Sequence, residues 1–448
     1  MSHRRVRYGG PKSPSRKMTV LPDTLRIERL SLEGRGVARV DGKTVFVAGA
    51  LAGEEVRATL TKAGKRFDES IATEIIHPST DRIEPVCPFY NECGGCDQQH
   101  LTTDAAITSK EAQIIELLNR QSHIIPKTVV TPIRSNKTLG YRRSARVGIN
   151  QRDNGELIIG FRRSSSHKLV NIDHCPVLTD RCNRFLEALR SGLQQAERVK
   201  VLTHIELTDG DNLLSVDIRC TKNPSDHIRN TLKTVGESQG VNLRLSIGRE
   251  IQTLCTAGVA SYSLNKQGLT LDFDTSDFLQ ANAQVNQQLV DTALTWLAPN
   301  AADRMLDLFS GLGNFSLPFA LKCQSVTAIE GSADMVERTL NNASNNGITN
   351  LTALASDLSH LDTDRPWLNE NYDLILLDPP RTGAAEIIPY LSKQRPRALL
   401  YIACDPMSLV RDSHLLHEQG YEMTRFQVAD MFPQTHHVES IALFERPL

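Results

Sequence analysis

The chain has 448 residues, a formal net charge of −1 and a hydrophobic content of 40%. This length predicts roughly two to four domains, each large enough to bury its own core. The composition is that of a folded globular protein, and it excludes a transmembrane protein because no apolar run reaches the roughly 20 residues that span a bilayer.

The N-terminal segment is basic. Residues 1–18 contain six Lys or Arg, no acidic residue and several Gly, Pro and Ser, which predicts a disordered basic arm. The apolar stretch of about 7–15 residues that a signal peptide needs is absent, so we expect a cytoplasmic protein. Short alternating segments with an Asp-Gly turn then predict a small β-barrel over residues 19–78.

Three cysteines follow in "VCPFYNECGGCDQQHL". Cys87, Cys93 and Cys96 have the spacing C-x5-C-x2-C, and Cys175 in "DHCPV" is a candidate fourth ligand. Zinc sites more often use paired Cys or Cys/His motifs, whereas three clustered cysteines plus a distant Cys-Pro are typical of iron–sulfur ligation. Zinc and three unconnected core thiols are the alternatives. Four further cysteines are interpreted as structural: Cys182, Cys220, Cys255 and Cys323.

The next region is predicted to be a β-rich central domain over residues 79–271. One helix follows the cysteines, between residues 101 and 120, because Ile107, Ile114 and Leu118 recur at helical spacing. Strand-like runs separated by turn residues then dominate. Residues 127–168 contain ten Lys or Arg and two acidic residues, which favours phosphate contacts over an ordinary solvated face. The arginines concerned are Arg142, Arg143, Arg146, Arg162 and Arg163.

Residues 272–448 alternate between helical and buried strand-like segments, which predicts a parallel sheet with helices on both faces. In "MLDLFSGLGNFSLPFA" a buried strand leads into a turn at Gly311 and Gly313. A turn of this kind lets a ligand approach the backbone, although it is often only a tight connection. No pyrophosphate-binding motif is present. Asp307 before the turn suits a cationic ligand such as S-adenosylmethionine, and Glu330 is a candidate ribose ligand.

Polar residues also end later strands of this predicted sheet. Asp378 begins "DPPR" after the fourth strand and Cys404 ends the fifth, so both should face one crevice. Glu439 in "THHVESIALF" starts a late strand-like run and is a candidate base. A buried small hydrophobe is the alternative for Cys404, and a solvated carboxylate is the alternative for Glu439. His436 and His437 are interpreted as supporting or surface groups.

Together "DLFSGLGNF", "LLDPPR", "IACDP" and "HHVES" resemble the RNA uracil-C5 methyltransferases over nearly the whole chain. The N-terminal barrel resembles a TRAM domain, an RNA-binding barrel of the OB type. The predicted fold is therefore multidomain α/β, with a TRAM β-barrel, a β-rich central domain that carries an iron–sulfur cluster, and a C-terminal Rossmann-like class I methyltransferase domain. With the cysteine pattern, the chain is similar to members that methylate 23S ribosomal RNA.

The resemblance implies site residues and cofactors. The nucleophile falls on Cys404 and the proton-abstracting carboxylate on Glu439. The cluster would be a 4Fe-4S cluster on the four cysteines named above. In such enzymes a thiolate adds to uracil C6, so that C5 can take the methyl group. The contacts to S-adenosyl-L-methionine fall on Gln280, Phe309, Asn314, Glu330, Asp357 and Asp378.

Two residues depart from the family pattern. Ser310 stands where Cys is frequent and is expected to be harmless. Asp405 stands where Asn is frequent, and its negative charge would oppose thiolate formation at Cys404.

The resemblance also implies a target and leaves alternatives. Single-stranded or looped 23S ribosomal RNA is expected, because a uracil must leave its stack before a thiol can reach C6. We expect a monomer that binds neither DNA nor a membrane. The alternatives are methylation of tRNA uracil or of an exocyclic amine, and a non-catalytic RNA-binding assembly factor. Amine methyltransferases place an aromatic residue after D-P-P, where this chain has Arg381.

Overall fold

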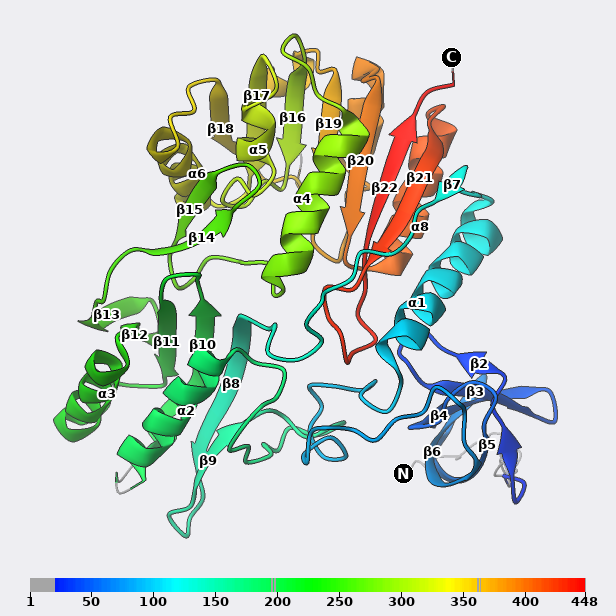
Figure 1. Cartoon of the computed structure of the whole chain (residues 1–448), viewed down its shortest axis with the longest axis vertical. Helices are drawn as coiled ribbons and strands as arrows, with labels where there is room; N and C mark the ends of the chain where they lie inside the picture. Colours follow the sequence, from blue (N-terminus) through cyan, green and yellow to red (C-terminus); the bar gives the residue numbers. More distant parts are fainter. Residues whose placement is uncertain (1–20, 195, 197–198, 361, 363, 448) are drawn as a thin grey trace, which may run out of the picture. The chain divides into compact units, whose positions relative to one another are not determined.

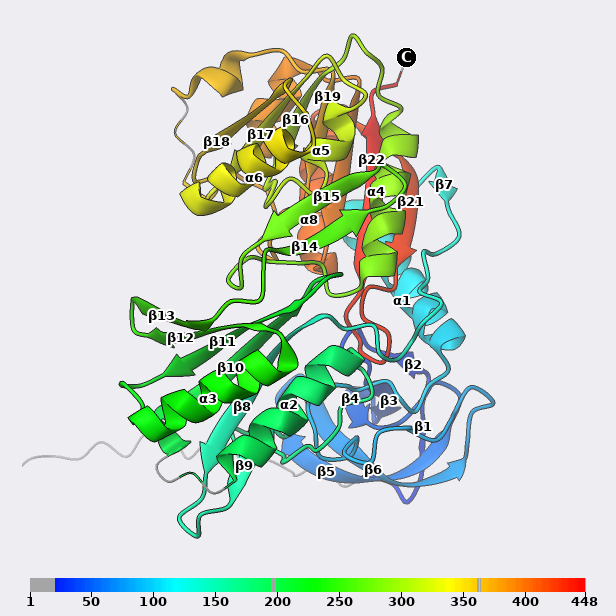
Figure 2. The same cartoon turned by 60° about the vertical axis from the view of Figure 1, so that its left-hand side comes forward.

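The computed structural model describes residues 21–194, 196, 199–360, 362 and 364–447 (Figures 1 and 2). The predicted basic arm, residues 1–18, lies outside this range. The chain divides into two compact units, residues 1–82 and residues 83–448. Among the described residues, no helix is both long enough and apolar enough to cross a membrane.

The first unit is a six-stranded sheet around a small apolar core. Its strand order is β1-β5-β6-β4-β3-β2, and Ile27, Val45 and Val56 are fully buried within it. Asp41 and Gly42 have φ values of 49° and 79° and form the predicted turn between β3 and β4. The strands are β1 (Leu25–Arg26), β2 (Arg29–Leu30), β3 (Gly36–Val40), β4 (Lys43–Ala48), β5 (Glu55–Ala63) and β6 (Phe67–His77).

The second unit begins with the cysteine segment and then builds a central sheet of order β13-β12-β11-β10-β8-β9. Two amphipathic helices that the sequence analysis did not single out, α2 and α3, share an apolar core with it. Thr179 and Ser225 cap them through their side chains. The elements are β8 (Ser144–Gln151), β9 (Leu157–Gly160), α2 (Asp180–Leu193), β10 (Leu202–Asp209), β11 (Leu214–Cys220), α3 (Asp226–Gln239), β12 (Asn242–Ile247) and β13 (Glu250–Cys255).

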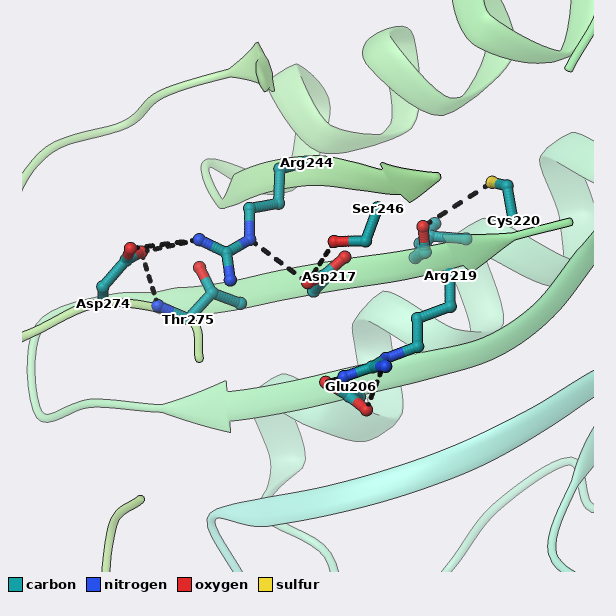
Figure 3. A network of polar contacts seen from close by, with 9 residues as sticks. Glu206, Asp217, Arg219, Cys220, Arg244, Ser246, Asp274 and Thr275 are labelled. Atoms are coloured by element: carbon teal, nitrogen blue, oxygen red, sulfur yellow. Dashed lines mark hydrogen bonds and ion pairs between the residues drawn. The ribbon is translucent and has the colours of Figure 1, made fainter. Parts of the chain in front are cut away.

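The strands of the central sheet also carry a polar network, drawn in Figure 3. Arg244 donates to Asp217 at 3.2 Å and to both oxygens of Asp274 at 3.0–3.1 Å. Ser246 donates to Asp217 at 2.7 Å, and Arg219 pairs with Glu206 at 2.9 Å. Because Asp274 follows the strands that lead to the C-terminal sheet, Arg244 ties the central sheet to that segment.

The C-terminal sheet has the order β18-β17-β16-β19-β20-β22-β21-β7. Strands β16 to β20 are parallel, and β22 is antiparallel to both of its neighbours. This is the predicted doubly wound arrangement. The strands are β16 (Arg304–Leu308), β17 (Ser325–Glu330), β18 (Leu351–Ala355), β19 (Leu374–Leu377), β20 (Ala398–Ala403), β21 (Glu422–Ala429) and β22 (Glu439–Glu445).

Helices cover both faces of this sheet (Figures 1 and 2). One face packs against α4 (Ala283–Leu297), α5 (Ser316–Ala320), α6 (Ala333–Asn345) and the hairpin of β14 (Ala260–Leu264) and β15 (Leu269–Phe273). The other packs against α1 (Thr103–Leu117), its π-helical continuation Leu118–Ser122, α7 (Ile388–Leu391) and α8 (Pro406–Glu418). Neighbours Met305 and Leu306 lie in opposite cores, as strand alternation requires.

The predicted helix of residues 101–120 is therefore present as α1, but its apolar side chains pack on the C-terminal sheet. Ile107, Ile114 and Leu118 belong to that core, and β7 (Thr128–Val129) extends the same sheet through β21. The predicted domain boundary between residues 271 and 272 falls within β15 and stays a prediction.

Candidate active site

A cavity of about 880 Å³ opens beside the carboxyl ends of the parallel strands. It is bounded by the turn after β16, the end of β17, the loop after β19 and the end of β20. Ligands of doubly wound sheets bind at this edge. All eight residues that were assigned to the cofactor or to catalysis line this one cavity: Gln280, Phe309, Asn314, Glu330, Asp357, Asp378, Cys404 and Glu439.

The turn after β16 has the backbone that its glycines predict. Phe309, Gly311 and Gly313 all have positive φ, at 64°, 57° and 91°. Glu330, at the tip of β17, accepts the backbone N–H of Gly311 and that of Ser332, each at 3.0 Å. Each carboxylate oxygen can accept a second hydrogen bond, so Glu330 can hold the turn and still bind ribose hydroxyls.

Asp307 does not line the cavity, contrary to the role considered for it. It is fully buried and accepts a hydrogen bond from the Ser316 hydroxyl. Burial raises the pKa of Asp307 to about 7. Its place below the Gly-rich turn makes it a support for the turn instead of a contact for a cationic ligand.

The wall behind Asn314 contains two residues that sequence reasoning missed. Tyr262 donates to the Asn314 side-chain oxygen at 3.1 Å, and Asn286 exchanges amide hydrogen bonds with Asn314 at 2.8 and 3.0 Å. Tyr262 comes from β14 and Asn286 from α4. No local motif marks either residue, because their roles depend on packing between distant segments.

Arg143 corrects one sequence prediction, since it does not face RNA. Its side chain is buried, and its Nε donates to the Gln280 carbonyl oxygen at 2.7 Å. The guanidinium carbon lies 4.9 Å from the centre of the Tyr262 ring, and burial lowers the pKa of Arg143. It therefore supports the cofactor wall. Arg146, Arg162 and Arg163 are exposed, and Arg142 is half-buried.

Cys404 and Glu439 meet across neighbouring antiparallel strands. Ala403 of β20 pairs with Ser440 of β22. Cys404 directly follows Ala403, and Glu439 directly precedes Ser440, so in this antiparallel register the two side chains come to the same end of the strand pair. Both line the cavity. Figure 1 shows β20 and β22 side by side in this sheet.

The electrostatics of the cavity favour the neutral forms of Cys404 and Glu439. Burial, the charge of Glu439 and that of Asp378 raise the pKa of Cys404 to about 12, and Arg381 opposes this rise. Burial and Asp378 raise the pKa of Glu439 well above its usual value, again against Arg381. Burial raises the pKa of Asp378 to about 7. Such perturbed groups in one cleft are typical of a catalytic centre.

Asp357 has the opposite environment. The hydroxyl and backbone N–H of Ser359 donate to its Oδ1 at 2.6 and 2.9 Å, and His360 contacts its Oδ2. These hydrogen bonds lower the pKa of Asp357 to about 2, so it is a stable anion at the rim of the cavity.

Ser310 and Asp405, the two departures from the family pattern, each have a structural explanation. Ser310 is buried in the turn, where its backbone N–H donates to Ile329. Asp405 caps α8 by accepting the backbone N–H of Ser408 at 2.9 Å. The side chain of Asp405 is therefore directed to the helix terminus, where a carboxylate is favourable.

Cys87, Cys93, Cys96 and Cys175 lie near one another. A negative charge on Cys175 contributes to raising the pKa of each of the other three thiols, after the larger effect of burial. The backbone joins the segments: Gly94 N–H donates to the Arg162 carbonyl at 2.9 Å. Within the described residues, however, no group of three or more Cys, His, Asp or Glu side chains is arranged to hold a metal ion.

Two family models match the chain. Residues 104–447 match the family model described as tRNA (Uracil-5-)-methyltransferase, and residues 24–71 match the TRAM domain. The expected TRAM domain is thereby confirmed.

Relatives cover nearly the whole chain. The 23S rRNA (uracil(1939)-C(5))-methyltransferase RlmD of Halomonas elongata is 40% identical, over 94% of this chain and 89% of that protein. The protein of the same name from Pseudomonas syringae pv. tomato is 39% identical, over 94% of this chain and 93% of its own.

A solved structure has a similar fold. The tRNA (uracil-54, C5)-methyltransferase of Pyrococcus abyssi, in complex with S-adenosyl-L-homocysteine, superposes with a TM-score of 0.72 at 20% identity. The match covers 94% of this chain and 100% of that one. From the family match and the relatives together, the chain belongs to the S-adenosylmethionine-dependent RNA uracil-C5 methyltransferases.

Proposed function

We propose that this protein methylates C5 of one uracil in 23S ribosomal RNA and produces 5-methyluridine. The observation that carries the proposal is the convergence of Cys404 and Glu439 on the cavity that also holds the six assigned cofactor contacts. The choice of 23S ribosomal RNA follows the names of relatives that match over more than nine-tenths of this chain.

In the proposed reaction the Cys404 thiolate adds to C6 of the uracil. The electron pair of the C5–C6 double bond moves toward the C4 carbonyl, so C5 becomes a nucleophile. S-adenosyl-L-methionine supplies the electrophilic methyl group when it is bound. Glu439 then removes the C5 proton, the double bond re-forms, and the Cys404 sulfur leaves.

The cavity fits this cofactor. Glu330 has free acceptor capacity for a ribose, the Gly-rich turn gives close access to the backbone, and Asp357 and Asp378 supply carboxylates for a ligand that carries positive charge. Arg381 is the cation that opposes the pKa shifts of both Cys404 and Glu439, so it favours the charged forms that react.

The RNA would be held by the barrel and by exposed arginines of the central region. Arg146, Arg162 and Arg163 are exposed to phosphates, which would compete with Glu206 at 3.6 Å for Arg146 and with Glu92 at 2.6 Å for Arg163. The uracil must be extruded from its stack, because the cavity lies at a strand edge, where Glu439 is buried and Cys404 is half-buried.

We also propose that Cys87, Cys93, Cys96 and Cys175 hold a 4Fe-4S cluster. The four thiols are electrostatic neighbours of one another. Three clustered cysteines plus a distant Cys-Pro are more typical of a cluster than of zinc, and each thiolate would bond a different iron. The cluster would fasten the cysteine segment to the chain that follows β9, which carries Arg162 and Arg163.

Metal analysis tests the cluster proposal. Protein purified without oxygen should contain iron and acid-labile sulfide in equal amounts, and Cys175→Ala should lose both. The control Cys220→Ala changes a buried thiol of the central core and should retain both. Stoichiometric zinc without sulfide would contradict the proposal.

The substrate proposal is tested by methyl transfer. Labelled S-adenosylmethionine is offered with 23S ribosomal RNA and with tRNA, and the modified nucleotide is mapped. We expect 5-methyluridine at one position of 23S ribosomal RNA. Label confined to tRNA, or label on another base, would contradict it.

A further inference from the structure

The segment that carries Glu439 into the cavity is a loop. Residues 430–438, here named the 430–438 loop, connect β21 to β22, and Glu439 is the first residue of β22. The position of the Glu439 carboxylate therefore depends on what holds this loop.

The first half of the loop has two anchors. Lys110 of α1 donates to the Asp430 carboxylate at 3.0 Å, and both side chains are buried. The Tyr141 hydroxyl donates to the Pro433 carbonyl at 2.8 Å. Breaking a buried ion pair of this kind is costly, so residues 430–433 are fixed independently of the rest of the loop.

The second half is held by the residue that follows Cys96. The backbone N–H groups of Asp97 and Gln98 donate to the Gln434 carbonyl at 3.2 and 3.0 Å. The Asp97 carboxylate accepts the backbone N–H of His436 at 2.8 Å and contacts the His436 ring nitrogen Nδ1. Gln434 has a φ of 75°. This left-handed backbone conformation is unfavourable for a residue other than glycine, so the surrounding contacts must maintain it.

These contacts leave a short path to the base. Only His437 and Val438 separate His436 from Glu439. The His437 ring packs against the His436 ring, with ring centres 4.2 Å apart, and against the Phe432 ring, with ring centres 6.0 Å apart. Burial, reinforced by the neighbouring His436, lowers the pKa of His437 to about 4, so the ring packs as a neutral group.

We infer that Asp97 is a positioning residue for Glu439, and that the cysteine segment thereby orients the group that removes the C5 proton. The inference rests on the proposed function. It also explains why the segment with three cysteines is joined to the 430–438 loop, more than 300 residues away in the sequence. Two backbone hydrogen bonds and the Asp97 carboxylate join them.

The inference predicts a defect in one step. Without Asp97 the thiol can still add to C6 and C5 can still take the methyl group, because Cys404 and the cofactor wall are held by other elements. Proton removal from C5 needs Glu439 in place. A misplaced base should therefore trap a methylated RNA that remains covalently bound to the protein.

The test compares Asp97→Ala with Asp104→Ala in the full-length protein. Asp104 is an exposed aspartate of α1 paired with exposed Arg134, and it lies outside the site. In single turnovers with labelled S-adenosylmethionine and 23S ribosomal RNA, adduct is resolved on denaturing gels. For Asp97→Ala we expect adduct formation within about twofold of wild type and release about 10- to 100-fold slower. Asp104→Ala should match wild type.

Asp97→Asn supplies the conservative variant. Its side-chain oxygen can still accept the His436 N–H, so release should be restored to within about fivefold of wild type. If Asp97→Ala does not fold, the same two rates are measured for Asp97→Ser, whose shorter side chain loses the present contacts with His436, and wild-type release in that variant would likewise overturn the inference. Wild-type release in Asp97→Ala, or slow adduct formation with normal release, would overturn it. Absence of any methylated uracil with the wild type would instead contradict the proposed function.

Discussion

Cys404 and Glu439 could each have had an ordinary structural role instead of a catalytic one. The alternative was a buried small side chain for Cys404 and a solvated carboxylate for Glu439. The pairing of Ala403 with Ser440 brings both to one cavity. The burial of Glu439, at 5% exposure, excludes the solvated alternative.

Glu439→Gln should separate methyl transfer from product release. The amide cannot accept the C5 proton, so turnover should fall by about 10²- to 10⁴-fold while adduct still forms. Turnover and gel-resolved adduct measure this. Glu445→Gln at the other end of β22 is the control, because Glu445 accepts a hydrogen bond from Thr424 and lies outside the cavity. Equal turnover in both variants would contradict the role of Glu439.

The pH dependence of the methylation rate follows from the raised pKa values of Cys404 and Glu439. Thiolate and carboxylate are the reactive forms, and burial raises the pKa of Cys404 to about 12 and that of Glu439 well above its usual value. Each group is protonated below its pKa, so the single-turnover rate at saturating RNA and cofactor should rise with pH through the neutral and alkaline range. A rate that falls as pH rises through neutrality would contradict this.

Site residues were predictable where they end strands. Parallel strands present their carboxyl ends at one edge, so Glu330, Asp378 and Cys404 could be placed together from their positions in the sequence. Arg143 could not, because its burial depends on Gln280 and Tyr262, which approach only in the folded chain. The charge count of its segment indicated an exposed side chain.

At the scale of elements, the Gly-rich turn is the part whose sequence and conformation agree most closely. Both glycines have positive φ, but their surroundings differ. A Cβ on Gly311 would meet only Met335 at 3.8 Å, whereas a Cβ on Gly313 would lie 2.3 Å from Leu317 and 3.2 Å from Thr339.

The two glycines therefore form a matched pair of variants. Gly311→Ala should cost about 1–2 kcal/mol of stability from backbone strain alone. Gly313→Ala adds overpacking of the buried Leu317 side chain, a further cost of about 1–3 kcal/mol, and should weaken cofactor binding more. Denaturant unfolding and calorimetric titration with S-adenosylhomocysteine measure both. Equal effects would show that the crowding at Gly313 is relieved by movement of Leu317.

Several elements were harder to predict than this turn. Helices α2 and α3 carry good N-caps, Thr179 and Ser225, yet they lie between strong strand signals that dominated the interpretation of the region. The helix of residues 101–120 was predicted, but local periodicity does not specify which sheet it covers. Its packing against β21 is non-local and comes only with the folded chain.

At the scale of the whole molecule, the division near residue 82 separates the barrel from the unit that contains the cavity. Every lining residue belongs to residues 83–448. The alternating segments of residues 19–78 allowed the barrel to be predicted from sequence, because strands, turns and a small core are all local there.

Removal of residues 1–82 should therefore affect the binding of RNA and the binding of the cofactor differently. The remaining chain should bind S-adenosylhomocysteine with an affinity within about threefold of the full chain. Its affinity for RNA should fall, and the salt dependence of RNA binding should become weaker, because fewer phosphates are contacted. Calorimetry and filter binding at two salt concentrations measure this. Loss of cofactor binding in a folded truncated protein would contradict the assignment of the cavity to one unit.

The central claim is that the Cys404 sulfur bonds to the pyrimidine ring. It is tested most directly with a 23S ribosomal RNA fragment that carries 5-fluorouridine at the methylated position, since C5 then holds no proton that Glu439 can remove. After incubation with S-adenosylmethionine and protease digestion, mass spectrometry should find the methylated nucleotide attached to the peptide that contains Cys404. A stable adduct on any other residue, or methyl transfer by Cys404→Ala, would contradict the account.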